Sequence, residues 1–417
     1  MISNLPKDLL EEILSKLPFN SMKAVCLTCK TWNDLSKTES FAKMHICKAT
    51  RAHLYMMIAM IPHNLYLMSS FVDDNNNNPS IEHKCQLRFL NNQVSIYRVF
   101  HYEGLVLCIL KDVTRIVIWN PFLRQTRWIK LRFSHRTDVW DTFRYALGYE
   151  VKGSCRSVKF LRFLDYFSHQ FFWYEIYDFD SGLWRSLDVT PYWCIYCAAT
   201  SVSLKGNTYW CAKERNMSIE SYIKHIICFD FTSERFGPLL PLPMVNSEEH
   251  NYNNVTLSCV KEEKLAVLFQ SEDSEESQFE IWITTKIDVE TVSWIKFLRM
   301  DKSPWISIAG SFFIDEEKNV LMSFGTQYYN KCTIRKRSVN IVGEDGYVRK
   351  LDPGVPIEGL CRPDVCCYVP SLIQVIKKPV GGKRIEQSSL ENRRFDQSML
   401  RLAALEKLLK KKQQGYW

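Results

Sequence analysis

The sequence predicts a multi-domain α+β chain in which a small helical unit precedes an all-β, propeller-like domain and a basic C-terminal helix. Three observations carry this prediction. The first 45 residues have apolar side chains at helical spacing, residues 86–376 are a succession of short β-rich runs, and those runs repeat about every 55 residues.

The composition is that of a globular protein. Of the 417 residues, 46% are hydrophobic and 24% are charged, which excludes disordered, collagen-like and fibrous classes. At about 150 residues per domain, the length predicts two or three domains. The longest apolar stretch, residues 54–61, is far shorter than the roughly 20 residues of a membrane-spanning helix, so no membrane span is expected.

The N-terminus does not resemble a secretion signal, because no basic region precedes an apolar core and a small-residue cleavage site. We therefore expect the protein in the cytoplasm, the nucleus or both. The fifteen cysteines are odd in number, and these compartments are reducing. The sequence thus predicts mostly small buried thiols and no disulfide framework.

Residues 1–45 are expected to form the helical unit. One apolar stripe runs between Pro6 and Pro18 and consists of Leu9, Leu10, Ile13, Leu14 and Leu17. A second stripe follows the capping residues Asn20 and Ser21 and consists of Met22, Val25, Cys26, Cys29, Trp32 and Leu35. Because a unit this short cannot bury both stripes well, the pattern predicts a partner.

Residues 46–85 are expected to be a linker, with a polar loop at 75–79, and the β domain is expected over 86–376. One repeated phrase is a strand, a polar turn and a trailing aromatic residue. These aromatic residues are Trp128, Trp184, Phe236, Trp294 and Tyr347. We expect them to fill the space between neighbouring sheets.

A second repeat is a hairpin with a short polar turn, found at 201–210, 255–269 and 312–324. The period is close to the roughly 50 residues of a kelch-type blade, and two hairpins per period give a four-stranded blade. A strand at 366–376 is expected to pair within 86–110 and to close a kelch-like propeller of about six blades.

The tail, residues 377–417, holds most of the positive charge. It has eleven basic and four acidic residues, while the whole chain has a net charge of +8. A nearly neutral body argues against a nucleic-acid-binding core. Residues 386–412 are expected to form a helix with the apolar stripe Met399, Leu400, Leu402, Ala403, Leu405, Leu408 and Leu409.

The N-terminal unit resembles the F-box. The dipeptides Leu5-Pro6 and Leu17-Pro18 lie twelve residues apart, and Cys29-Lys30-Thr31-Trp32 and Phe41 follow them. The next segment is similar to the plant F-box-associated interaction domain. The phrases that carry this similarity are Gly104–Leu107, Trp119–Phe122, Tyr145–Tyr149, Leu204–Trp210 and Val369–Leu372.

The resemblance covers residues 1–376 and implies a substrate receptor of a Skp-cullin-F-box (SCF) ubiquitin ligase. In that family the F-box docks on a Skp-type adaptor of the cullin-RING ligase, and the β domain binds a protein substrate. The stripe and the resemblance together identify the expected adaptor-binding residues, which are Leu5, Pro6, Leu9, Ile13, Leu14, Leu17, Pro18, Val25, Cys29 and Trp32. No residue is assigned to the substrate.

An enzymatic role finds no support in the sequence. It lacks the Gly-x-Gly-x-x-Gly, Gly-Lys-Ser/Thr and His-Glu-x-x-His motifs, so we expect no catalytic residues and no cofactor. Cys26-x-x-Cys29 and Cys194-x-x-Cys197 have zinc-like spacing, but a structural site needs four ligands, so we expect no metal. Asp178 and Asp180 are expected to stabilise a turn.

Two alternatives remain open. The first is a ligase-independent binding or scaffold propeller, lectin-like or protein-binding, with a decayed F-box; adaptor binding separates it from the receptor. The second concerns the tail, which we expect to lie on the propeller as a solvated helix. Binding of nucleic acid or anionic lipid, or nuclear targeting, is the alternative role for its charge.

Overall fold

The structure is a computed structural model. The residues that it describes are 5–17, 25, 27–36, 38, 41, 44, 55–61, 64–72, 79–87, 95–102, 104–112, 114–121, 123, 125–133, 143–152, 155–166, 171–195, 201–215, 225–243, 252–261, 263–271, 277–303, 312–316, 319–329, 334–343, 348–351, 364–368, 375 and 386–414. The statements below refer to this part of the chain.

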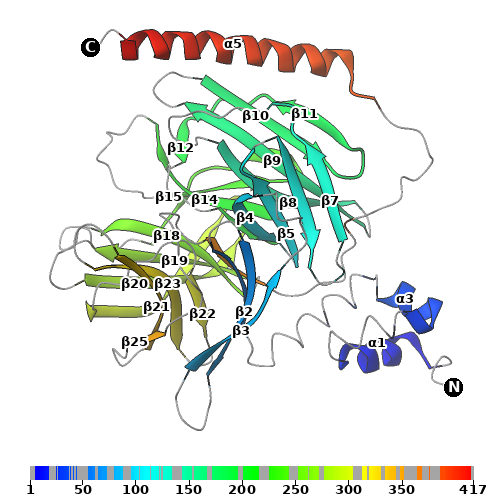
Figure 1. The fold of residues 1–417 in the computed structure, drawn as a ribbon, viewed down its shortest axis with the longest axis vertical. Coiled ribbons are helices and arrows are strands. Elements are labelled where there is room, and N and C mark those ends of the chain that lie inside the picture. Colours follow the sequence, from blue (N-terminus) through cyan, green and yellow to red (C-terminus); the bar gives the residue numbers. More distant parts are fainter. Residues whose placement is uncertain are drawn as a thin grey trace.

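Helices lie at the two ends of the chain, and strands occupy the region between them (Figure 1). The helices are α1 (Lys7–Ser15), α3 (Lys30–Leu35) and α5 (Ser389–Gln414). Among the described residues, none of the helices combines the length and the apolar character required to cross a membrane.

The strands form six antiparallel sheets. Sheet A has the order β26 (Asp364–Cys367), β1 (Tyr55–Ile61), β2 (Asn64–Val72) and β3 (Pro79–Leu87). Sheet B contains β4 (Ile96–Tyr102), β5 (Leu105–Leu110), β6 (Arg115–Asn120) and β7 (Gln125–Lys130). Sheet C contains β8 (Phe143–Lys152), β9 (Cys155–Tyr166), β10 (Phe171–Asp178) and β11 (Leu183–Leu187).

The other three sheets follow in chain order. Sheet D contains β12 (Trp193–Ile195), β13 (Val202–Leu204), β14 (Asn207–Glu214), β15 (His225–Asp230), β16 (Arg235–Phe236) and β17 (Leu240–Pro241). Sheet E contains β18 (Tyr252–Val260), β19 (Lys264–Ser271), β20 (Ser277–Ile287) and β21 (Val292–Ser303). Sheet F contains β22 (Phe312–Asp315), β23 (Val320–Tyr329), β24 (Ile334–Gly343) and β25 (Val348–Leu351).

Neighbouring sheets meet through their inner strands. Sheet A meets sheet B through β26 and β4, and sheet B meets sheet C through β4 and β8. Sheet C meets sheet D through β8 and the pair β13 and β14. The same pair contacts β18 of sheet E, and β18 contacts β22 of sheet F. The apolar clusters lie between these sheets, and the largest joins sheets B and C. The six sheets therefore pack one on the next in chain order, as the blades of a propeller do, which confirms the predicted all-β, propeller-like architecture.

Two phrases singled out in the sequence meet between sheets C and D. Gly148 on β8 lies so close to the next sheet that a Cβ atom there would be 2.4 Å from the Gly206 carbonyl oxygen. The Tyr149 N–H donates to the same oxygen at 3.1 Å, and the Ser203 hydroxyl donates to the Leu147 carbonyl at 2.9 Å. Glycine at position 148 is thus required for the two sheets to approach.

The predicted hairpins are confirmed, and their turns share a backbone feature. Lys205, Lys261 and Asn319 each have a positive φ near 50°, in the turns β13–β14, β18–β19 and β22–β23. With Gly206 at φ 86°, the first turn has two consecutive left-handed residues, as type I′ hairpins require. The recurrence of this turn explains why the repeat was visible in the sequence.

The expected linker at 46–85 is corrected by the structure, because β1 and β2 lie inside it and β3 begins there. Strand β1 pairs with β2 over seven residues, from Tyr55 opposite Ser70 to Ile61 opposite Asn64. The expected closing strand at 366–376 is also corrected. Strand β26 is shorter, begins at Asp364, and pairs with β1 instead of a strand within 86–110.

The trailing aromatic residues behave differently from one another. Trp184 is buried in the cluster between sheets B and C, and Phe236 packs edge-on against Phe163 of sheet C. The Trp294 indole N–H donates to the Pro241 carbonyl at 3.0 Å and so joins sheet E to sheet D. Trp128 contradicts the prediction, because its ring is exposed and packs under the Arg115 guanidinium. Tyr347 lies outside the described residues.

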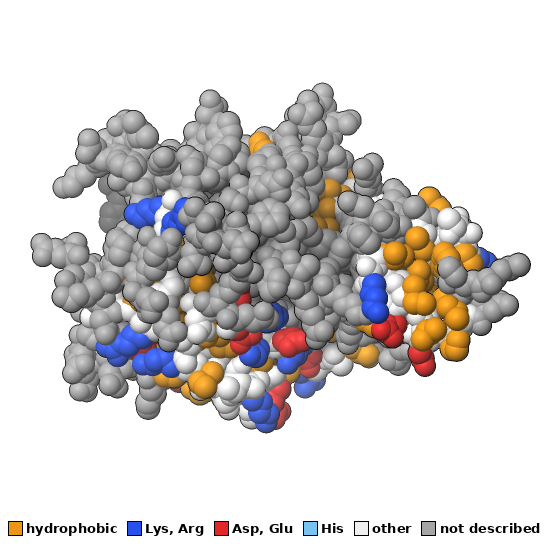
Figure 2. All heavy atoms as spheres, turned by 90° about the horizontal axis from the view of Figure 1, so that it is seen from below, with side chains coloured by type: hydrophobic (Ala, Val, Ile, Leu, Met, Phe, Trp, Pro, Cys, Tyr) orange, Lys and Arg blue, Asp and Glu red, His pale blue; other side chains and the backbone are white. Residues whose placement is uncertain are grey.

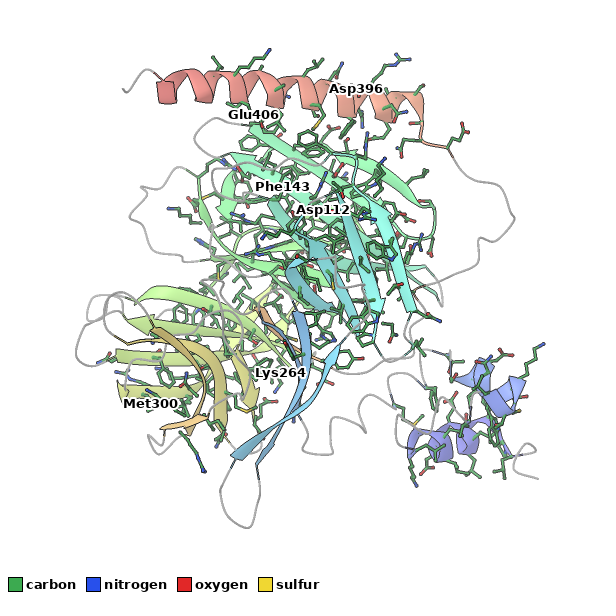
Figure 3. All side chains as sticks on the ribbon, viewed as in Figure 1. Asp112, Phe143, Lys264, Met300, Asp396 and Glu406 are labelled. Atoms are coloured by element: carbon green, nitrogen blue, oxygen red, sulfur yellow. The ribbon has the colours of Figure 1, made fainter. Side chains whose placement is uncertain are left out.

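Helix α5 lies along the outer edge of sheet C, as expected for a helix on the propeller (Figures 1 and 3). Leu402 is buried in the cluster of sheets B and C, and Phe395 packs on Trp173. The Glu391 carboxylate accepts from the Ser186 N–H at 2.6 Å and from Arg132 at 3.2 Å. Glu391 therefore satisfies a backbone donor of the edge strand β11.

Among the described cysteines, Cys108, Cys211 and Cys228 are buried, as predicted, whereas Cys29, Cys194 and Cys259 are half-buried. Burial raises the pKa of the Cys211 thiol to about 12. The buried thiols therefore act as small apolar core residues.

Candidate adaptor interface

Helix α1 begins directly after Pro6, whose extended backbone has φ −53° and ψ 146°. The Leu10 N–H donates to the Pro6 carbonyl at 3.1 Å and closes the first turn. At the other end, the Leu17 N–H donates to the Leu14 carbonyl at 3.1 Å. The Leu-Pro dipeptide thus fixes the start of the helix, as the sequence predicts.

One side of α1 forms the core of the helical unit. Leu10 and Leu14 are buried there against Leu35 of α3 and Phe41. Around this core, four expected adaptor-binding residues are half-buried; these are Leu5, Leu17, Val25 and Trp32. The unit therefore has a small core made of its own four buried residues.

The other side of α1 carries apolar residues in water. Leu9 is 45% exposed and Ile13 is 41% exposed, and the two lie one turn apart on the helix. Leu27 is 82% exposed. Figure 2 shows hydrophobic side chains gathered at the end of the molecule that carries the helical unit. We call Leu9 and Ile13 the outer apolar face.

The expected adaptor-binding residues differ in exposure, and five of them, Leu5, Leu17, Val25, Cys29 and Trp32, are half-buried. Pro6, Leu9 and Ile13 are exposed, and so are available to a partner. Leu14 is a correction, because it is buried in the unit's own core instead of facing outward. Pro18 lies outside the described residues.

The second helical stripe was predicted to run through Cys29, and the structure shows that it does not. The Cys29 backbone is extended, with φ −146° and ψ 130°, and Cys29 precedes the first residue of α3. The second stripe is therefore interrupted there and is not one continuous helix. A hydrogen bond from the Trp32 backbone N–H lowers the pKa of the Cys29 thiol.

Leu27 is an exposed apolar residue of the helical unit that was not predicted from the sequence. It falls between Val25 and Cys29, off the stripe that the spacing defines, so its periodicity places it with the solvated residues. The available signal was the residue type, because an isolated leucine off a helical stripe exposes apolar surface.

A residue of the β domain also contacts the helical unit. Leu123, in the turn between β6 and β7, packs against the core of Leu10, Leu14, Leu35 and Phe41. The Leu123 N–H donates to the Asn120 side-chain oxygen at 3.0 Å, and Asn120 is buried. Asn120, from the phrase singled out in the sequence, therefore fixes the backbone of the residue that meets the helical unit.

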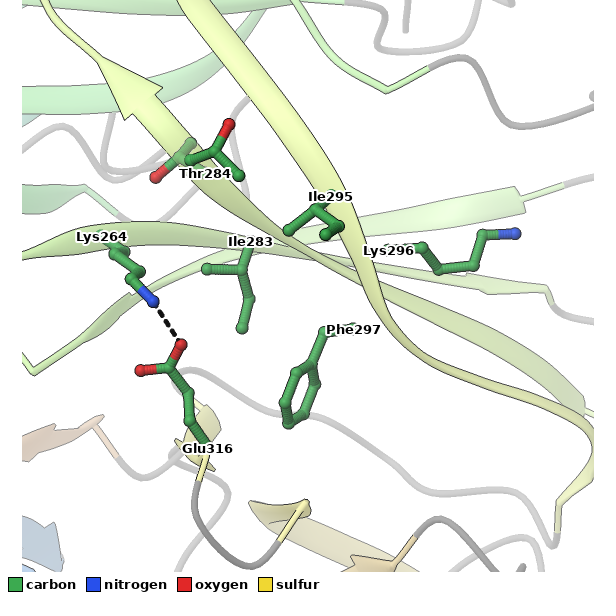
Figure 4. A pocket seen from close by; sticks show the side chains of 8 residues that line it. Lys264, Ile283, Thr284, Ile295, Lys296, Phe297 and Glu316 are labelled. Carbon is green, nitrogen blue, oxygen red and sulfur yellow. Dashed lines mark hydrogen bonds and ion pairs between the residues drawn. The ribbon is translucent and has the colours of Figure 1, made fainter.

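The β domain offers a hollow of about 390 Å³ on sheet E (Figure 4). An ion pair between Lys264 and Glu316, with 2.5 Å between Nζ and Oε1, lies at one side of it. Ile295 and Phe297 line the hollow together with the hydroxyl-bearing Thr284 and Thr285.

Other residues considered in the sequence have structural roles. The Asp178 carboxylate accepts from the Asp180 N–H at 2.9 Å and the Ser181 N–H at 2.8 Å, which confirms the expected turn. The described residues include no group of three or more side chains able to hold a metal ion. Cys26 and Cys197 lie outside those residues.

Comparison with known proteins identifies both parts of the chain. Residues 2–44 match the F-box domain, and residues 56–375 match the F-box associated beta propeller domain. The second match begins within β1, in agreement with the strands found in the expected linker. Among solved structures, apo AztD from Citrobacter koseri aligns with 75% of this chain and 98% of its own, at 10% identity and a TM-score of 0.34.

Curated relatives match over nearly the whole length. The F-box protein At5g41490 of Arabidopsis thaliana is 58% identical over 91% of this chain and 97% of its own. The F-box protein At2g38590 is 56% identical over 98% of both chains, and the F-box/kelch-repeat protein At4g33290 is 53% identical over 95% of both; each is from the same plant. The chain therefore belongs to the plant F-box proteins that carry a C-terminal F-box-associated β-propeller domain.

Proposed function

We propose that this chain is the substrate-recognition subunit of a Skp-cullin-F-box ubiquitin ligase. The F-box binds a Skp-type adaptor and, through it, the cullin-RING ligase, while the β domain binds a target protein. Membership of the F-box family and the propeller-like β domain support this assignment.

The observation that carries the proposal is the outer apolar face of the F-box. Leu10, Leu14, Leu35 and Phe41 already close the core of the unit, so Leu9 and Ile13 are not needed inside it. Covering apolar surface is favourable by about 25 cal/mol per Å², which makes this face a suitable docking surface for a helical partner.

In this proposal the chain is a receptor and not itself an enzyme. It supplies no reacting group, and its contribution is to hold the lysines of the target protein near the conjugating enzyme. Such positioning raises the effective concentration of the two reactants.

Co-purification with a Skp-type adaptor tests the proposal. The double variant Leu9→Ser, Ile13→Ser removes the half-exposed aliphatic groups and is expected to weaken adaptor binding by about 2 kcal/mol, or roughly thirtyfold. Ile295→Ser, a comparably exposed residue on sheet E, serves as the matched control and should leave binding unchanged. Circular dichroism checks that each variant is folded.

The same experiment addresses the alternative of a ligase-independent propeller. A native chain that does not bind the adaptor would overturn the receptor assignment and leave a free-standing binding or scaffold protein. Equal binding by the native chain and the Leu9, Ile13 variant would show that the adaptor uses a different face.

A further inference from the structure

Helix α5 has two distinct sides. The side that faces sheet C contains Glu391, Phe395, Met399, Leu402 and Leu405, all buried or half-buried. This side is fully accounted for by packing and by the contacts of Glu391. The opposite, outward side of the helix faces solvent and makes none of these contacts.

Three leucines lie on the outward side in water. Leu390 is 61% exposed, Leu400 is 71% exposed and Leu408 is 59% exposed. The helix has 26 residues, so these leucines are distributed along most of its length. The predicted apolar stripe is therefore split between the two sides, with Leu402 and Leu405 inward and Leu400 and Leu408 outward.

Basic residues are interleaved with these leucines. Arg393, Arg401 and Lys407 are exposed, as is Arg394, which lies 3.8 Å from the Asp188 carboxylate. The sequence of the helix continues with Lys410, Lys411 and Lys412. Two acidic residues of α5, Glu391 and Glu406, are buried or half-buried, and Asp396 is the exposed one. The outward side therefore combines apolar groups with a strong excess of positive charge.

The position of α5 allows a flat surface to reach it. The helix forms one end of the molecule and runs along it, with the sheets on one side only (Figure 1). An exposed helix of this kind can lie flat on the surface of a bilayer. Leucines enter the acyl boundary of a bilayer, while Lys and Arg side chains remain among anionic headgroups.

We propose that the outward side of α5 binds the surface of an anionic phospholipid bilayer, with Leu390, Leu400 and Leu408 at the lipid and the basic residues on the phosphates. This peripheral site is independent of the adaptor interface, which lies on the F-box. A nucleic acid would satisfy the basic residues alone, since phosphates leave the leucines in water, so the leucines favour lipid.

The test is co-sedimentation of the full chain with vesicles. Phosphatidylcholine vesicles with about a third phosphatidylserine are compared with phosphatidylcholine alone. The native chain should bind the anionic vesicles only, and added salt should weaken binding. Leu400→Ser, Leu408→Ser and, separately, Arg401→Gln, Lys407→Gln should each weaken it by about tenfold.

Matched controls lie elsewhere on the surface. Lys111→Gln, Lys130→Gln removes the same charge from sheet B, and Ile295→Ser removes an exposed aliphatic group from sheet E. Both should retain native binding. The proposal is overturned if the anionic vesicles do not bind the native chain. It is also overturned if the control variants lose as much vesicle binding as the α5 variants do. Binding to a DNA duplex that depends on Arg401 and Lys407 but not on the leucines would assign the helix to nucleic acid instead.

Discussion

At the scale of single residues, the most buried charges of the β domain are Arg162 and Glu175. Both side chains are fully buried, and the Arg162 Nε donates to the Glu175 carboxylate at 2.8 Å. The guanidinium also lies over the rings of Phe143 and Trp173 and donates to the Phe133 carbonyl. Burial raises the pKa of Glu175, and the positive charge of Arg162 opposes that rise.

Arg162→Ala is expected to reduce the free energy of unfolding by about 3 to 5 kcal/mol, because it leaves the Glu175 carboxyl buried without its partner. Urea denaturation measures the effect. Arg185→Ala, at the exposed pair with Glu234, is the control and should cost about 1 kcal/mol or less. A cost for Arg162→Ala as small as that of Arg185→Ala would contradict this account.

The buried side chain of His101 is expected to make the free energy of unfolding depend on pH. Its Nε2 accepts from the Gly104 N–H at 2.9 Å, and burial lowers its pKa from 6.5 to about 3. The unfolded chain therefore binds a proton that the folded chain excludes. Stability from this group is present above pH 6.5 and is lost as the pH falls toward 3, by up to about 1.4 kcal/mol per pH unit.

Unfolding of the native chain and of His101→Gln at pH 7 and pH 5 checks this dependence. The variant should lose less stability than the native chain between the two values, because glutamine does not titrate. The same loss in both proteins would show that His101 is not responsible.

At the scale of secondary-structure elements, Glu391 fastens α5 to sheet C. Its carboxylate binds Ser186 and Arg132, and its backbone carbonyl accepts from Arg132 at 3.2 Å. Glu391→Ala leaves the Ser186 N–H and the Arg132 guanidinium without this partner, at a cost of about 3 kcal/mol. Faster proteolysis and hydrogen exchange across α5 are expected. Asp396→Ala, on an exposed position of the same helix, should leave both rates near native values.

The elements differ in how far the sequence could predict them. The hairpins at Lys205, Lys261 and Asn319 were predictable because short polar turns separate runs of β-forming residues. The hairpin of β1 and β2 was not, because only Pro62-His63 separates its two apolar runs, without the cluster of polar turn residues found in the predicted hairpins. Once β1 was missed, the partner of β26 could not be predicted either.

The candidate site was predictable only in part for a different reason. Leu9 and Ile13 alternate along α1 with Leu10 and Leu14, so both pairs have the spacing of a helix face. Tertiary packing against Leu35 and Phe41 decides which pair is buried. Those contacts depend on how the helices fold back on one another, and periodicity carries no information about them.

At the scale of the whole molecule, Leu123 joins the F-box to the β domain. Its contact with the F-box core joins the unit that carries the outer apolar face to sheet B. Leu123→Ser is expected to weaken the packing between the F-box and the β domain by about 1 to 2 kcal/mol. The F-box should then move more freely relative to the sheets. Small-angle scattering should show a larger maximum dimension, while adaptor affinity stays within about twofold of the native value. An unchanged scattering curve would show that other contacts set the arrangement.

The central claim is that the F-box alone binds the Skp-type adaptor, and hydrogen exchange of the full chain with and without the adaptor tests it most directly. We expect slower exchange in α1 and in residues 25–35 when the adaptor is added, and unchanged exchange in the six sheets and in α5. Protection concentrated in the sheets, or no protection in α1, would contradict it.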